Sequence, residues 1–214
     1  MNSSLRSTVR SSFRLFLFAA LLVNASGQTP TTSGRAEVRG ILGRARVAPA
    51  GGAFTVLSGG AVLTAGSIIE TASESAVDLY LGPAAGILRL TQGTTVVIEK
   101  LNVTGQDWEV ELDLRQGELL GKASSVPGSK LMVKTATSLS VVGEGQFRFS
   151  ARGYVVLLNG KILVGTSPVK GEPVTTPLVA PPAVYFSPME GVRPAPPALV
   201  GEVKNQTRSK LPKG

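Results

Sequence analysis

The chain contains no cysteine and no histidine, and aromatic residues make up only 5% of its 214 residues. Without cysteine it has no thiol nucleophile, no disulfide and no attachment point for a lipoprotein anchor. Without histidine it lacks the usual imidazole base of catalysis and a common ligand of zinc and haem. These absences predict a protein that is not an enzyme and that carries no cofactor.

Positive charge is concentrated outside the central part of the chain. The net charge is +8, yet residues 35–165 hold thirteen basic and eleven acidic side chains. The rest comes from Arg6, Arg10 and Arg14 and from an excess of three positive charges after residue 165. A nucleic-acid-binding domain gathers positive charge on its folded body. The distribution therefore argues against a nucleic-acid partner.

Residues 1–27 have the three parts of a secretory signal peptide. Arginines precede an apolar run at residues 15–23, and small residues follow it. Cleavage after Gly27 would leave Gln28 as the first residue, and Ala25 marks the alternative cleavage point. The nine-residue run is short of the roughly 20 residues that a permanent membrane helix needs. We expect a periplasmic or secreted protein with no stable membrane span after cleavage; an uncleaved anchor is the alternative.

Short alternating segments separated by glycine-rich turns fill residues 35–165, after a flexible polar lead-in at residues 28–34. The clearest is WEVELDLR at residues 108–115, in which apolar and charged side chains alternate. About eleven such segments occur at even spacing. They predict an all-β fold, a single antiparallel β-sandwich or a β-roll or barrel-like domain of about ten to eleven short strands.

The stretch from Leu139 to Val164 is predicted to be the centre of this domain, as three short strands: Leu139–Val142, Gln146–Ser150 and a third. The last of them begins at Tyr154 and turns back on itself at Asn159-Gly160. That dipeptide is typical of a two-residue type I′ turn, which needs a positive φ at both positions.

Proline changes the character of the chain after residue 165. Ten of the fourteen prolines lie in residues 166–214. Proline fixes φ and has no N–H to donate, so this segment is excluded from a central sheet. We predict a Pro-rich, basic and largely irregular tail, in which Val184-Tyr185-Phe186 could dock as an edge strand.

Glu109, Glu111 and Asp113 form the acidic cluster of the body and are the candidate metal ligands. Their side chains lie about 7 Å apart along one strand face, where Ca²⁺ could bind with help from a neighbouring strand. The competing interpretation is a solvated face balanced by nearby basic side chains. No catalytic, phosphate-binding or dinucleotide-binding motif occurs.

The order of several motifs between Val38 and Val164 resembles the FecR domain family. The matching pieces are Leu57-Ser58-Gly59-Gly60 with Leu63, Gly66, Ile68, Ile69 and Thr71; Ser75–Leu79 with Leu88-Arg89-Leu90; Leu112–Gly117; and Val133-Lys134-Thr135, Val141-Val142-Gly143, Gln146–Phe149 and Val155–Val164. The resemblance implies an all-β, non-enzymatic domain outside the cytoplasm. The best-known members relay signals from iron–siderophore uptake to a sigma factor, using a transmembrane helix.

We therefore expect an exported binding, scaffolding or signalling module of the bacterial cell envelope, with an envelope protein or polymer as partner. One alternative is a membrane-anchored signal relay, similar to sigma-factor regulators, that keeps its N-terminal helix. The other is a carbohydrate- or Ca²⁺-binding surface protein. Trp108 could stack on a sugar ring, although its alternation with Val110 favours packing in the core.

Overall fold

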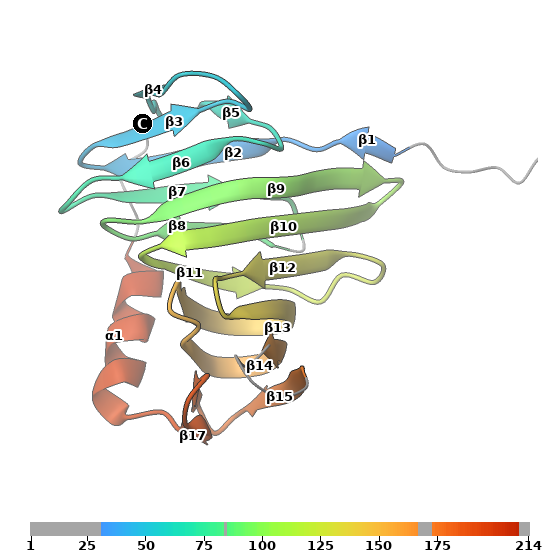
Figure 1. Ribbon diagram of the computed structural model, residues 1–214, viewed down its shortest axis with the longest axis vertical. Coiled ribbons are helices and arrows are strands. Elements are labelled where there is room, and N and C mark those ends of the chain that lie inside the picture. Colours follow the sequence, from blue (N-terminus) through green and yellow to red (C-terminus); the bar gives the residue numbers. More distant parts are fainter. Residues whose placement is uncertain (1–30, 84, 167–172, 210–214) are drawn as a thin grey trace, which may run out of the picture.

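The computed structural model describes residues 31–83, 85–166 and 173–209, which form an almost entirely β structure with one helix (Figure 1). Strands hold 59% of these residues, which confirms the predicted all-β class. The predicted signal peptide, with Ala25, Gly27 and Gln28, lies outside the described residues.

One series of strands forms what we call wall A. Each strand pairs with the next, antiparallel except for β10 with β12. In ladder order the members are β4 (Thr55–Val56), β3 (Ala45–Ala48), β6 (Ile68–Thr71), β9 (Thr95–Thr104), β10 (Asp107–Gln116), β12 (Lys130–Lys134), the first half of β13 (Ser138–Ser150), the second half of β14 (Val155–Thr166) and β15 (Val174–Ala180). The far half of β9 also pairs with β1 (Thr31–Ser33).

A second antiparallel series forms wall B. Its members in ladder order are β5 (Val62–Leu63), β2 (Ala36–Leu42), β7 (Ala76–Tyr80), β8 (Ile87–Leu90), β11 (Glu118–Ala123), the second half of β13, the first half of β14, β16 (Val184–Ser187) and β17 (Gly191–Pro194).

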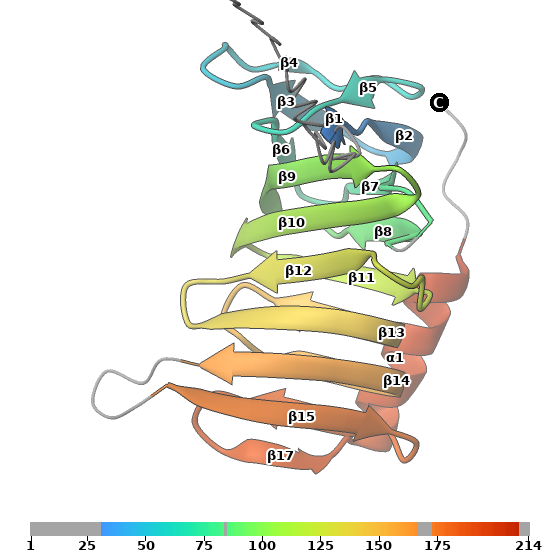
Figure 2. The same cartoon turned by 90° about the vertical axis from the view of Figure 1, so that its right-hand side faces the viewer.

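β13 and β14 run through both walls, so the walls are two parts of one sheet that curls into a half barrel (Figures 1 and 2). Alternate side chains of both walls point inward and form a single buried cluster. Leu112 comes from wall A, whereas Phe147 and Phe149 come from wall B, with their rings edge to face at 5.3 Å. Trp108 packs half-buried against this cluster, as its alternation predicts.

The predicted turn at Asn159-Gly160 is wrong. Both residues lie inside β14, where Asn159 pairs with Gln146 of β13. The chain reverses instead between β13 and β14, around Gly153, which has a φ of 86°. The predicted breaks near residue 143 are likewise register shifts inside one long strand. Glycine here bends a strand between two walls and does not end it.

The prediction of a largely irregular tail is also wrong for residues 174–208. This stretch supplies three strands and the helix α1 (Pro197–Arg208), which brings the described chain to seventeen strands. Thirteen of these begin between residues 35 and 165, where about ten to eleven were expected. β15 tolerates Pro177 because, among the described strands, it pairs only with β14 and its other edge takes no ladder partner. Pro197 occupies the first helical turn, where the missing N–H is not needed. Val184–Ser187 does form a strand, as expected, but it is not an edge strand, because β14 and β17 pair with its two sides.

Candidate functional site

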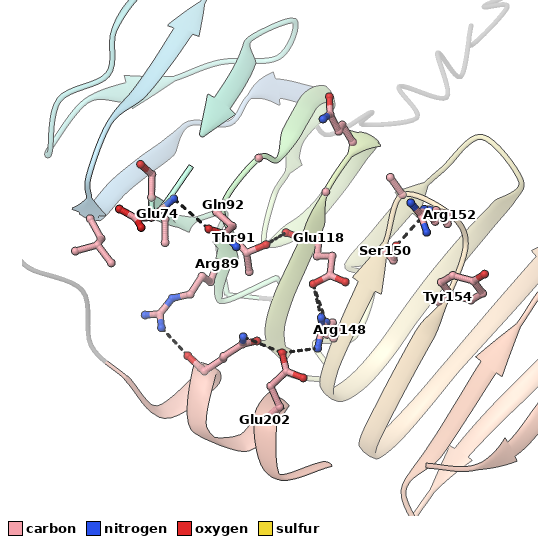
Figure 3. Close-up of a pocket in the computed structure, with 18 of the residues that line it drawn as sticks. Glu74, Arg89, Thr91, Gln92, Glu118, Arg148, Ser150, Arg152, Tyr154 and Glu202 are labelled. Carbon is pink, nitrogen blue, oxygen red and sulfur yellow. Dashed lines mark hydrogen bonds and ion pairs between the residues drawn. The ribbon is translucent and has the colours of Figure 1, made fainter. Parts of the chain in front are cut away.

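A groove of about 1110 Å³ opens beside α1 on the outer face of wall B (Figure 3). Its lining includes charged residues from the sheet, among them Arg89, Glu118 and Arg148, and Glu202 and Gln206 from α1. We call this space the α1 groove. The helix runs across the strands and forms one side of it (Figures 2 and 3).

One cross-strand row of outward-facing residues underlies the helix. Neighbours in the row are direct partners in the ladder. From β7 to β17 the row reads Asp78, Arg89, Leu120, Arg148, Val156, Tyr185 and Arg193. Strands lie about 4.8 Å apart, so the part from β8 to β16 spans about 19 Å. The twelve residues of α1 are about 18 Å long, which matches that part.

Arg89 fastens the C-terminal end of α1. Its Nε and Nη2 donate to the two carboxylate oxygens of Asp78 at 2.7 and 2.8 Å, and both side chains are nearly buried. Its Nη1 donates to the Gln206 carbonyl at 2.5 Å and to the hydroxyl of Ser209. A cation at this position satisfies carbonyls that the last helical turn leaves without partners.

Arg148 holds the middle of α1 more loosely. Its Nε and Nη2 donate to Glu118 Oε2 at 2.9 and 2.5 Å. Its Nη1 lies 3.1 Å from Oε1 of Glu202 on α1, but that buried nitrogen makes no directed hydrogen bond. The contact is therefore an electrostatic attraction with poor geometry, and the Glu202 side chain remains 48% exposed.

An apolar seat completes the contact between α1 and wall B. Leu120, Val156 and Leu158 from the sheet and Val203 from α1 are buried together. Tyr185, Leu199 and Val200 are partly buried against them. Tyr154 stacks on Tyr185 at 5.9 Å, and burial raises the pKa of the Tyr185 hydroxyl, with a further contribution from Tyr154.

The side chains around the α1 groove suit holding a chain segment. Glu118 and Glu202 are both drawn to Arg148, and Ser150 Oγ accepts a hydrogen bond from the Arg152 amide at 3.3 Å. Both carboxylates therefore neutralise the guanidinium group of Arg148. The arrangement offers complementary charge and apolar contact, which are the means of recognition.

The acidic row predicted as a metal candidate lies on the opposite wall, where basic side chains pair with its carboxylates. Lys100 Nζ lies 3.5 Å from Glu109 and 3.1 Å from Glu111, while Arg115 Nε donates to Asp113 at 2.9 Å. In the part of the chain that the structure describes, no three acidic, histidine or cysteine side chains gather as metal ligands. The two glutamates raise the pKa of Lys100, with Glu111 the stronger influence. The carboxylates of this row are therefore balanced by cations, and the side chains of Glu111 and Asp113 are only partly exposed.

The α1 groove was not among the sites predicted from the sequence, although one signal pointed to it. Val155-Val156-Leu157-Leu158 is apolar without alternation, and all four residues are buried. A continuous apolar run is typical of a strand covered on both faces. That pattern requires a cover over wall B, which α1 provides with Val203.

Comparison with known proteins finds a weak structural similarity and no match in sequence. No protein-family model and no curated protein matches the chain. Two crystal structures of a "putative anti-sigma factor" from Parabacteroides distasonis ATCC 8503 are similar, at 19% and 18% sequence identity, each with a TM-score of 0.43. Each match covers 59% of this chain and 57% of that protein. The FecR resemblance therefore remains a prediction from sequence. Among the described residues, no helix is both long and apolar enough to cross a membrane.

Proposed function

We propose that this chain is a non-catalytic protein-binding module of the bacterial cell envelope. One observation carries the proposal: the outer face of wall B holds an amphipathic helix on a row of matched apolar and charged residues. A surface that binds one helix in this way has the contacts required to bind a helix of another protein. The FecR resemblance in the sequence supports the same role.

Export is part of the proposal and rests on the sequence of residues 1–27. Cleavage near Gln28 would release the domain outside the inner membrane, whereas an uncleaved N-terminus would make it an anchored signal relay. N-terminal sequencing of the protein recovered from the envelope distinguishes the two. A mature start at Gln28 or Ser26 supports the released module, and an intact Met1 supports the anchored relay.

Photo-crosslinking in living cells tests the binding function. A photoreactive amino acid at Gln92 or Arg152, both exposed and lining the α1 groove, should give an adduct of defined mass. The matched control is Thr175, an exposed position on β15 of wall A. Adducts from the groove positions alone support a specific site. Equal labelling from Thr175, or no adduct from the groove, contradicts the proposal.

A polymer partner is the other form of the predicted envelope interaction. Because the occupant seen on wall B is a helix, a protein partner fits the surface better than a polysaccharide. Sedimentation of the protein with purified peptidoglycan would favour the polymer.

A further inference from the structure

The helix α1 has few features that would stabilise it on its own. It starts at Pro197, its N-cap residue Pro196 supplies no side-chain hydrogen bond, and its first turn has no acidic residue. Gly201 lies in its middle, where an added Cβ would meet no atom within 4 Å. Isolated helices of about twelve residues are marginal in water, so α1 depends on its docking. Of its side chains, Val203 alone is fully buried.

The charged groups under α1 are held by partners within the sheet. Arg89 forms a bidentate pair with Asp78, and Arg148 bonds to Glu118, and neither pair involves a residue of α1. In the cross-strand row Leu120 lies between these two arginines, and Val156 lies on the other side of Arg148. Release of α1 would therefore expose a rigid row of cationic and apolar groups and leave the sheet pairing intact.

The helix also fills its seat incompletely. The α1 groove remains open beside it, and Arg148 Nη1 of wall B is buried without a hydrogen-bond partner, as is Gln206 Oε1 of α1 itself. A buried polar group without a partner costs free energy, so a helix that accepted a hydrogen bond from Arg148 Nη1 would bind better than α1 does. The space beside Gly201 would admit larger side chains.

We propose that α1 is an exchangeable cover and that wall B binds an amphipathic helix of a partner protein in its place. The partner helix has the pattern that α1 displays: apolar residues at the positions of Leu199, Val200 and Val203, and a carboxylate at the position of Glu202 that faces Arg148. It runs across the strands for about three turns, because the row from β8 to β16 has that length. This inference rests on the proposed binding function and identifies its partner class.

The test measures binding of a fluorescent peptide of residues 195–209 to the full chain. In the variant Val203→Asp the buried contact of α1 is lost, so the seat should be free and bind the peptide at least tenfold more tightly than the wild type does. The matched control is Asn205→Asp, which adds the same charge at an exposed position of α1 and should behave like the wild type. A peptide with Glu202→Lys should bind Val203→Asp at least tenfold more weakly than the parent peptide.

Equal binding to Val203→Asp and to the wild type, or equal binding of both peptides, would overturn the proposal. If Val203→Asp loses its β circular dichroism spectrum, hydrogen exchange of the wild-type chain is measured in place of peptide binding to the variant. An excess of peptide should then accelerate exchange of the α1 amides and leave those of β13 unchanged; unaltered α1 exchange sinks the proposal. A wild-type dimer that exchanges α1 between copies would also overturn it, because the occupant would be a second copy. In each of these cases photo-crosslinking in cells can still give adducts at the α1 groove. That experiment therefore tests the proposed binding function independently of the exchange of α1.

Discussion

Gly145 of β13 and Gly160 of β14 lie directly opposite each other in the ladder, and both have a positive φ, of 127° and 96°. A Cβ on either would collide with backbone of the facing strand: with Asn159 from Gly145, and with Glu144 from Gly160. Register shifts flank the pair on β13. The two glycines therefore form the bend at which both strands pass from one wall to the other.

Replacement of Gly160 by alanine should destabilise the whole domain. The backbone of the alanine would have to keep an unfavourable φ, and its methyl group would press on the Glu144 carbonyl. Together these effects should cost about 3 kcal/mol. Gly191→Ala is the control, because Gly191 has a φ of 75° but open space around it, so only about 1 kcal/mol is expected. Urea unfolding of both variants measures the difference. Equal losses would show that the close approach of the strands contributes nothing.

Asn159-Gly160 shows how far local sequence determines this fold. The requirement for a positive φ was predicted correctly for Gly160, and the apolar flanks were correctly predicted as strand. Yet the same dipeptide serves a hairpin turn and a strand bend equally well. Whether the dipeptide forms a turn or a bend depends on Glu144 and Gly145 of β13, which lie against Gly160. The all-β class followed from alternation along the chain, whereas the continuity of β13 and β14 depends on pairing across it.

Loss of Arg89 should cost more stability than loss of any exposed arginine. Arg89→Met would leave the carboxylate of Asp78, itself only 9% exposed, without a cation, at a cost of about 3 kcal/mol. It would also release the end of α1 at Gln206. The control is Arg39→Met, whose ion pair with Glu37 is exposed, with an expected cost below about 1 kcal/mol. Thermal unfolding of both variants tests this, and a similar small loss in each would contradict the structural role of Arg89.

The site was harder to predict than the fold because its residues are far apart in the sequence. Arg89 and Arg148 each occupy the polar position of an alternating strand, which is the pattern of an ordinary solvated face. The ladder aligns them with Leu120 in one row, and α1 covers that row. The acidic row on β10 attracted attention because its members are close in sequence. Its cationic partner Lys100 comes from the adjacent strand β9.

Stability should fall at alkaline pH partly through Tyr185. Burial raises the pKa of its hydroxyl above the usual value of 10.0, so the folded state favours the protonated, neutral form. The stabilisation is complete below the unfolded pKa and is lost as pH rises through the higher folded pKa. Absorbance titration of the phenolate should show a late transition that disappears in Tyr185→Phe. Tyr80→Phe, on β7, should leave that transition in place; its loss in that variant instead would contradict the assignment.

Gly201→Ala should strengthen α1 and make its opening rarer. Alanine favours a helix interior by about 0.5–1 kcal/mol over glycine, and no neighbour obstructs the added methyl group. Because α1 is expected to open locally, the gain should appear as roughly two- to fivefold slower hydrogen exchange of its amides, with those of β13 unchanged. Lys204→Ala, at an exposed position of the same helix, exchanges one good helix former for another and should alter the rate little. If Gly201→Ala instead slowed exchange equally in α1 and β13, the helix would open only with the whole domain and could not act as an exchangeable cover.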